Sequence, residues 1–417
     1  MGRYRFAYFD AHIEVFIPDE NLVPKLEAPP VPAIRDVYAA TRAACSAPIG
    51  APPLRTSFTA DTSVLIAVPD KSRRTDIKEV LRAVLDELGQ AQISKEGITI
   101  LIAQATHRPM HDAEIVQKIG REVAEQYRIV NHAYDDPSCL FHAGKTQEGI
   151  PIEFNRLVRE HDFIISIGTI SAHPVGGYSG GAKGLLPGIA GRHLTDYVHW
   201  EATRYPLFEI FGNCENPVRR EMEAIVAEVG LDFIVNVTEN ADREISSIFA
   251  GHYIDAHRAG VAFLRGAPLI AFPAEMPDVL ILGMGDDRPD FWAGAAGIYA
   301  ASALLKDGGV IVLFAACPEG VAPEHPVVLE YGYLRWRELE EAVQKGAVLD
   351  KTGASHGVTI GKILAQKNMQ VMLVSKGIGS AEAERCGFIF YEEPQRAVDA
   401  ALEVKGRGAR ILQYARI

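Results

Sequence analysis

The segment from residue 170 to residue 200 gathers side chains that could do chemistry around a bound anion. It holds His173, a glycine- and serine-rich run from Gly176 to Gly181, Lys183 and His199. Glycines let backbone N–H groups approach an anion closely, and a lysine inside such a loop can neutralise the anion or bond covalently to it. The histidines add metal-binding or proton-transfer capacity. This combination predicts a bound nucleotide-like cofactor.

Lys183 does not belong to a P-loop. In that motif Ser or Thr follows the lysine and holds magnesium, whereas Gly184 follows here and the G-x-x-x-x-G-K-[ST] spacing is absent. Kinase or NTPase activity is therefore not expected. His193 and His199 lie six residues apart on a predicted helix, where their side chains diverge, so they are poor joint ligands for one metal. His199 alone is available as one ligand.

Apolar runs alternate with helical patterns in the first part of the chain. The runs cover residues 63–70, 98–109 and 163–170, and helical patterns follow at about 78–88 and 112–127. Continuous apolar runs of this kind are typical of parallel strands that are buried on both faces. Ligands bind beyond the carboxyl ends of such strands, so polar residues at those ends are candidates for a site.

Asp70, His107 and His173 each lie at or just past the end of one of these runs, and we expect them to meet in one crevice. Two histidines on opposite faces of a carbon centre can remove and return protons, which is what a racemase or epimerase needs. Arg73 or Arg74, in the segment VPDKSRRTD, could bind a carboxylate or phosphate through two parallel hydrogen bonds. A solvated surface turn is the alternative interpretation of that segment.

A second set of apolar runs begins at residues 278, 309 and 370 and predicts a second domain. The segment 262–278 contains three prolines and is typical of a crossover between domains, with a boundary near residue 272. We therefore expect two α/β domains with parallel or mixed sheets. An N-terminal cofactor-binding and catalytic domain would cover 1–272, and a C-terminal α/β domain over 273–417 would close over an active-site cleft between the domains.

Composition is that of a soluble globular protein, with 48% hydrophobic and 23% charged residues among 417. A net charge of −12 argues against nucleic acid or an anionic membrane as the main partner. The five cysteines are scattered without a C-x-x-C pair, which favours reduced thiols and a cytoplasmic location over disulfides or a zinc site. No signal-peptide or membrane-spanning pattern is evident. His356 is interpreted as a structural cap at a helix start.

In combination, the motifs resemble the nickel-dependent lactate racemase family, the 2-hydroxyacid racemases and epimerases that use a nickel-pincer nucleotide. The resemblance is carried by D-K-S-R-R-T from Asp70, T-H-R-P from Thr106 and H-P-V-G-G-Y-S-G-G-A-K from His173, together with G-I-A-G at Gly188 and by His199. It extends over nearly the whole chain.

The resemblance implies a cofactor and its ligands. Lys183 would be joined through a thioamide to pyridinium-3-thioamide-5-thiocarboxylic acid mononucleotide, the nickel-pincer nucleotide, which cofactor-maturation proteins would supply. His199 would be a nickel ligand beside two sulfurs and one carbon of the cofactor, and such a soft donor set with one imidazole suits nickel. Ser179, Gly180 and Gly181 would lie against the nucleotide.

The resemblance also implies a mechanism. His107 and His173 would be an alternating acid/base pair, and Arg73 would hold the substrate carboxylate with Asp70 in support. The C2 hydride of a 2-hydroxy acid would move to the cofactor, leaving a planar keto acid, and would return to the other face. The cofactor would do the difficult step while the protein orients the reactants.

One stretch departs from the lactate-specific members of the family, which have a Tyr-Gln pair and a Lys near the first helix of the second domain. The aligned residues from Arg288 onward place Trp292, Ala293 and Ala296 there. Loss of the Gln and Lys removes a charge-assisted contact worth about 1.5–3 kcal/mol. The sequence therefore predicts a 2-hydroxy acid other than lactate. Trp292 with the two alanines would suit a larger or more apolar substrate, with Arg288 restoring a positive charge, and packing of the stretch in the core is the alternative interpretation.

Two other functions are compatible with the same residues. A zinc- or iron-dependent hydrolase or lyase would use His107, His173 and His199 as ligands. A cofactor-free protein that binds hydroxy acids would keep the fold without the chemistry, and the altered stretch from Trp292 to Ala296 is its best support.

Overall fold

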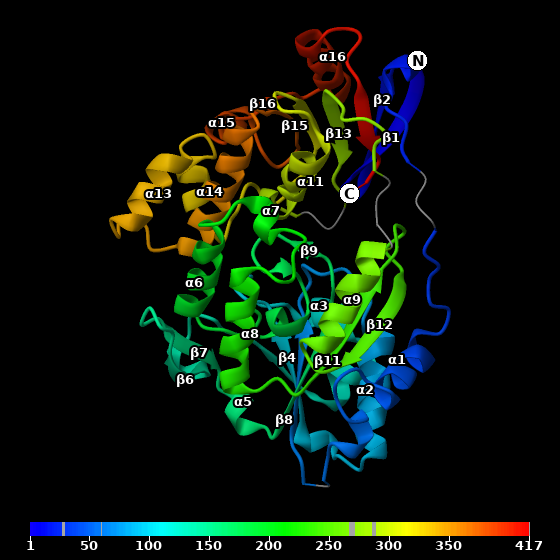
Figure 1. Cartoon of the computed structure of the whole chain (residues 1–417), viewed down its shortest axis with the longest axis vertical. Helices are drawn as coiled ribbons and strands as arrows, with labels where there is room; N and C mark the ends of the chain where they lie inside the picture. The colour runs from blue at the N-terminus through cyan, green and yellow to red at the C-terminus, as the bar shows by residue number, and fades with distance from the viewer. Residues whose placement is uncertain (27–29, 60, 267–271, 286–288, 417) are drawn as a thin grey trace. The chain divides into compact units, whose positions relative to one another are not determined.

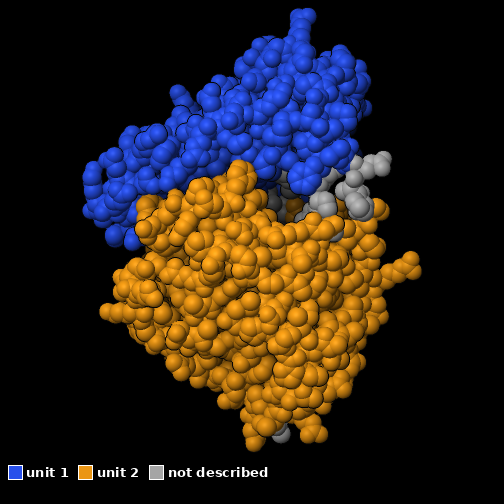
Figure 2. All heavy atoms as spheres, viewed as in Figure 1, with its two compact units in different colours: residues 1–28, 271–417 blue, residues 29–270 orange. Residues whose placement is uncertain are grey.

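The computed structural model describes residues 1–26, 30–59, 61–266, 272–285 and 289–416. The chain forms two compact units, which Figure 2 shows in different colours: unit 1 contains residues 1–28 and 271–417, and unit 2 contains residues 29–270. The first 28 residues therefore group with the C-terminal unit, which corrects the predicted domain over 1–272. Within the described residues, no helix combines the length and apolar character that a membrane span requires.

Unit 2 is built on a six-stranded sheet with the strand order β12-β11-β8-β3-β4-β5 (Figure 1). The strands are β3 (Val64–Pro69), β4 (Ile98–Ala103), β5 (Arg128–Asn131), β8 (Phe163–Thr169), β11 (Phe233–Glu239) and β12 (Ile245–Gly251). Neighbouring strands are parallel, except that β12 runs antiparallel to β11. The predicted parallel sheet of an α/β fold is thus confirmed.

The side chains of β3 alternate between two hydrophobic cores, which explains why the strand is a continuous apolar run in the sequence. Leu65 and Ala67 belong to a core that includes residues of helices α6 and α8, whereas Val64, Ile66 and Val68 belong to a second core with helices α1 and α2 (Figure 1). Both faces of the sheet are therefore buried, as the sequence predicts.

The helices of unit 2 are α1 (Val37–Ser46), α2 (Lys78–Gln90), α3 (Asp112–Ile119), α4 (Arg121–Gln126), α5 (Leu157–Glu160), α6 (Arg192–Ala202), α7 (Leu207–Ile210), α8 (Pro217–Val229) and α9 (Asp255–Gly266). The predicted single helix over 112–127 is divided at Gly120, which has a φ of 89° and ends α3. Two short hairpins pair β6 (Leu140–Lys145) with β7 (Pro151–Asn155) and β9 (Ala172–His173) with β10 (Gly177–Tyr178).

Unit 1 contains a five-stranded parallel sheet with the order β16-β15-β14-β13-β17. The strands are β13 (Val279–Gly283), β14 (Val310–Phe314), β15 (Gln370–Val374), β16 (Ile389–Phe390) and β17 (Ile411–Tyr414). The helices are α10 (Phe291–Gly294), α11 (Ala296–Leu304), α12 (Val327–Tyr331), α13 (Trp336–Gln344), α14 (Lys351–Gln366), α15 (Ser380–Arg385) and α16 (Pro394–Lys405).

An antiparallel hairpin of β1 (Gly2–Tyr8) and β2 (Ala11–Ile17) explains why the N-terminus belongs to unit 1. Its buried side chains, Phe6, Val15 and Ile17, share one hydrophobic core with β13, β14 and α16. Phe6 also meets Phe314 edge to face, with ring centroids 5.2 Å apart. The partners of this hairpin lie more than 260 residues further along the chain, so the local sequence does not reveal where it packs.

Candidate active site

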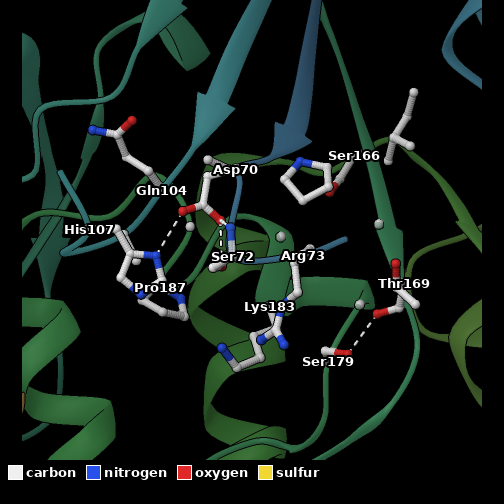
Figure 3. A pocket seen from close by; sticks show the side chains of 18 residues that line it. Asp70, Ser72, Arg73, Gln104, His107, Ser166, Thr169, Ser179, Lys183 and Pro187 are labelled. Atoms are coloured by element: carbon white, nitrogen blue, oxygen red, sulfur yellow. Dashed lines mark hydrogen bonds and ion pairs between the residues drawn. The ribbon is translucent and has the colours of Figure 1, made fainter. Parts of the chain in front are cut away.

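A pocket of about 100 Å³ lies in unit 2, at the carboxyl ends of β3, β4 and β8. β4 and β8 flank β3 on opposite sides, so the pocket lies at the point where the strand order reverses, which is where open α/β sheets bind ligands. Its polar lining includes Asp70, Ser72, Arg73, Gln104, His107, Ser166, Thr169, Ser179 and Lys183 (Figure 3). Six residues predicted from the sequence thus line one pocket: Asp70, Arg73, His107, Ser179, Gly180 and Lys183.

Asp70 and His107 are hydrogen-bonded at the end of β3, with 2.8 Å between Oδ2 and Nδ1 (Figure 3). The other carboxylate oxygen accepts hydrogen bonds from the N–H and hydroxyl of Ser72. Burial alone would raise the pKa of Asp70, but the charges and hydrogen bonds of His107, Ser72 and Arg73 outweigh it and lower that pKa. Asp70 is therefore an anion that orients the His107 ring.

Arg73 reaches the pocket from the loop after β3, and hydrogen bonds from a buried lysine hold this loop in place. The buried amine of Lys118, on α3, donates to the carbonyl oxygens of Arg73 and Thr75. Burial lowers the pKa of Lys118 to about 8, although the charges of Asp70, Asp76 and Glu239 oppose this shift. Asp70 and Glu239 face the Arg73 guanidinium and favour its charged form, although burial lowers its pKa.

Lys183 projects from a short 3-10 turn, Gly181–Gly184, that packs against β8. Its neighbour Gly184 lies so close to the strand that an added Cβ would be 2.0 Å from the Ser166 hydroxyl oxygen. Burial lowers the pKa of Lys183 well below its usual value, and the charges of Arg73 and Arg219 lower it further. In the part of the chain that the structure describes, this amine makes no hydrogen bond or ion pair. Figure 3 shows it beside Arg73.

His173 lies on β9 and is not one of the residues that line the pocket. Its Nδ1 accepts a hydrogen bond from the Val175 N–H at 3.1 Å. Burial, followed by the charges of Lys183 and Arg73, lowers the pKa of His173 well below 6.5. His173 is therefore a neutral imidazole, chiefly because it is buried.

His199 is buried on α6, where Nδ1 donates to the Thr195 carbonyl oxygen at 2.8 Å. This bond places the lone pair of the neutral ring on Nε2, the tautomer that binds a metal. Among the described residues, no three His, Cys, Asp or Glu side chains are grouped so that they could hold a metal ion by themselves.

Ser179 and Gly181, which the sequence assigns to the nucleotide, make contacts inside the protein. The Ser179 hydroxyl donates to the Thr169 carbonyl oxygen at 2.7 Å (Figure 3). The Gly181 N–H donates to Asn236 Oδ1 at 2.7 Å, and Gly181 does not line the pocket. Gly180 does line it, and its φ of 75° requires glycine.

Trp292 belongs to unit 1, where it stacks between two imidazole rings. The ring centroids of His325 and His356 lie 4.6 Å and 4.3 Å from that of Trp292. His356 lies in the middle of α14 and its Nε2 is 3.1 Å from the Tyr333 hydroxyl, so the prediction that it caps a helix is wrong. Arg288 lies outside the described residues.

Several residues that build the site gave no recognisable sequence signal. Gln104 lines the pocket and donates to the His132 carbonyl oxygen at 2.8 Å. Asn236, on β11, holds the glycine-rich turn, and Arg219, on α8, binds the same turn from the opposite side. All three are buried polar residues inside or beside predicted elements, and their burial becomes visible only in the structure.

Comparison with known proteins finds similar sequences. Residues 8–206 match the family described as the lactate racemase N-terminal domain. A lactate racemase from Thermoanaerobacterium thermosaccharolyticum is 29% identical over 297 residues, and one from Lactiplantibacillus plantarum is 29% identical over 282 residues. These alignments cover 69% and 66% of this chain, and the chain spans 66% and 64% of the length of those relatives.

Two solved structures share the fold. The lactate racemase apoprotein from Thermoanaerobacterium thermosaccharolyticum matches with a TM-score of 0.83 and 23% identity, over 100% of this chain and 98% of that one. A crystal structure of a protein from Thermotoga maritima matches with a TM-score of 0.74 and 18% identity, over 93% of this chain and 99% of that one.

The fold and the pocket define an α/β protein with a lysine, an arginine and an aspartate–histidine pair at the switch point of a parallel sheet. Residues 8–206 of this chain are similar to the lactate racemase N-terminal domain, and the chain is similar in sequence to two lactate racemases.

Proposed function

We propose that the chain is an isomerase, a racemase or epimerase that interconverts the C2 stereoisomers of a 2-hydroxy acid other than lactate. The observation that carries the proposal is the convergence of Lys183, Arg73 and the Asp70–His107 pair on one pocket. Curated relatives named lactate racemase support this reaction class.

The residues fit the nickel-pincer nucleotide, and we propose it as the cofactor. Bonding the cofactor to Lys183 through a thioamide requires a neutral amine, and the low pKa of Lys183 provides one. His199 would coordinate the nickel through Nε2, the ring nitrogen that carries the lone pair when Nδ1–H donates to the Thr195 carbonyl oxygen. When bound, the cofactor would accept a hydride from the substrate carbon and return it.

The protein's own groups would bind the substrate and move its hydroxyl proton. Arg73 would bind the substrate carboxylate through two parallel hydrogen bonds. His107 donates Nδ1–H to Asp70, so its neutral ring accepts a proton at Nε2. His173 accepts the Val175 N–H at Nδ1, so its neutral ring carries a proton on Nε2. The pair therefore starts with a base at His107 and a hydrogen-bond donor at His173, and the proposed acid role of His173 requires that its ring first take up a proton.

Trp292 is proposed to select the substrate, with Ala293 and Ala296 leaving room for a bulky side chain. Stacking between His325 and His356 fixes the Trp292 ring without the help of a ligand. Because the two imidazoles cover the faces of the ring, its edge would contact the substrate, and this apolar edge would favour a substituent larger than the methyl group of lactate.

The first test measures the mass of the intact protein after incubation with cofactor and nickel. Wild-type protein should gain the cofactor mass, and Lys183→Ala should not. Lys71→Ala is the matched control because Lys71 lies near the same site but pairs with Glu114 at 3.7 Å, and this variant should gain the mass. Cofactor mass on Lys183→Ala would contradict the attachment. A hydrolase or lyase with a simple metal site would gain no covalent mass.

The second test screens chiral 2-hydroxy acids for loss of optical rotation with the loaded protein. His107→Gln and His173→Gln should each slow interconversion about 10²–10⁴-fold, the usual contribution of a general acid or base. Both variants should still acquire the cofactor mass. Unchanged rates in either variant would refute the acid/base pair, and binding without interconversion by the wild type would identify a binding protein.

A further inference from the structure

The glycine-rich turn that carries Lys183 is closed around a buried guanidinium. Arg219 is fully buried on α8, and its three nitrogens donate to three carbonyl oxygens of the turn. Nε donates to Gly176 at 2.9 Å, Nη1 to Gly180 at 3.2 Å, and Nη2 to Tyr178. One planar group therefore fixes the curvature of the whole turn.

Close contacts also confine the turn on its other sides. An added Cβ at Gly177 would lie 1.9 Å from the Asn213 carbonyl oxygen, and one at Gly180 would lie 2.6 Å from Asn236 Oδ1. His257 Nε2 donates to the Ser179 carbonyl oxygen at 3.0 Å. The carbonyls must therefore point toward Arg219, because the close contacts leave no space for another arrangement.

The Gly180 carbonyl links Arg219 to the lysine turn. It accepts Nη1 of Arg219 and also the backbone N–H of Lys183, at 3.2 Å in both cases. A displacement of Arg219 is thereby transmitted to the start of the 3-10 turn on which Lys183 stands. We propose that Arg219 is a positioning residue, which sets the direction of the Lys183 amine in the pocket and holds a positive charge near it.

The charge of Arg219 is only loosely balanced. The nearest carboxylate oxygen, of Glu223, is 4.0 Å from Nε, and Glu223 makes its short contacts, 2.8 and 2.9 Å, with Arg258. The charge of Arg219, which Glu223 balances only in part, also acts on the amine of Lys183. Desolvation lowers the pKa of Lys183 most, then Arg73 and Arg219, while Asp70 opposes them. His173 is the other titratable group coupled to this amine.

This inference rests on the proposed function in one respect: cofactor attachment is the use that a neutral Lys183 amine would have. The contacts of Arg219 and its charge are properties of the protein without cofactor. The test therefore uses the full-length protein with no cofactor. Competitive acetylation of Lys183 by acetic anhydride, followed by mass spectrometry between pH 6 and 11, gives the titration midpoint of that amine. Hydrogen exchange of the amides from Gly176 to Lys183 reports whether the turn is held.

Three variants separate charge from packing. Arg219→Met removes both, and should speed exchange in the turn and raise the Lys183 midpoint by about one pH unit, the effect of one nearby charge. Arg219→Lys keeps the positive charge but loses the forked hydrogen bonds of the guanidinium. Hydrogen exchange in the turn should therefore become faster while the titration midpoint of Lys183 stays low. His257→Phe is the matched control: it releases Ser179 without removing a charge, since burial keeps the pKa of His257 well below 6.5.

The outcomes are distinct. Exchange and midpoint both unchanged in Arg219→Met would overturn the proposal. An equal rise of the midpoint in Arg219→Lys and His257→Phe would show that Arg219 acts by packing alone, which also overturns it. If Arg219→Met does not fold, Arg219→Lys decides, because a raised midpoint there is incompatible with the charge effect. Failure of cofactor attachment in wild-type protein would sink the proposed function and leave these measurements intact.

Discussion

Gly184 offers a sharp test of how the turn that carries Lys183 meets the sheet. An added Cβ would lie 2.0 Å from the Ser166 hydroxyl oxygen and 3.2 Å from the Ser166 Cβ, whereas ordinary contacts are 3.4–4 Å. Gly184 does not have a positive φ, so alanine is disfavoured by the contact and not by the backbone. Overpacking of this kind costs typically about 1–3 kcal/mol.

We therefore expect Gly184→Ala to lower the free energy of unfolding of unit 2 by about 2 kcal/mol. For a unit of this size, that corresponds to a fall in the unfolding temperature of about 4–8 °C. The double variant Gly184→Ala/Ser166→Ala removes the 2.0 Å contact and keeps the 3.2 Å one, so it should recover most of the loss. Scanning calorimetry of the full chain measures both.

Gly89 provides the control for the glycine-to-alanine change itself. It lies in α2, and an added Cβ would meet no atom within 4 Å. Gly89→Ala should therefore raise stability by about 0.5–1 kcal/mol, the usual gain within a helix. If Gly184→Ala behaves like Gly89→Ala, or if Ser166→Ala gives no recovery, the close approach of turn and strand is refuted.

Three further outcomes are expected. Because the pKa of Asp70 is lowered in the folded protein, its contact with His107 stabilises the fold above about pH 4 and loses that effect as the pH falls further. Denaturant titrations from pH 2.5 to 6 should show this loss of stability in the wild type and a smaller loss in Asp70→Asn. The pKa of Lys118 is lowered from 10.5 to about 8, so the free energy of unfolding of the wild type should rise by up to about 3 kcal/mol between pH 8 and 10.5. Lys118→Met should lack this rise. An equal dependence of stability on pH in the two proteins would contradict the prediction. Trp292→Ala should raise KM about tenfold for a bulky apolar 2-hydroxy acid, equivalent to about 1.4 kcal/mol of lost apolar contact; a similar increase for small hydroxy acids would contradict selection by the ring.

The sequence predicts the central strands of unit 2 because each strand carries its own signal. β3, β4 and β8 are buried on both faces and therefore read as continuous apolar runs. The residues at their carboxyl ends could be assigned to one pocket for the same reason. The break at Gly120 was missed because the apolar spacing continues across it, although its positive φ ends the helix.

Other parts of the site depend on contacts between distant segments. Arg219 lies 39 residues or more beyond the carbonyls that it binds, and nothing in its neighbours distinguishes it from a surface residue of an amphipathic helix. The same applies to His356, which sequence suggests is a cap but which the fold buries against Trp292 and Tyr333. Such residues are defined by their burial, which a single sequence does not display.

The β1–β2 hairpin bears on how the chain is made. Unit 2 is continuous in sequence and could finish folding while it leaves the ribosome, but the hairpin must wait for β13, which is about 260 residues later. At about 5–20 residues per second, Phe6, Val15 and Ile17 spend roughly 13–50 s without their final neighbours. During that interval the nascent chain displays an apolar ribbon that a chaperone could shield, and slower translation would lengthen the exposure.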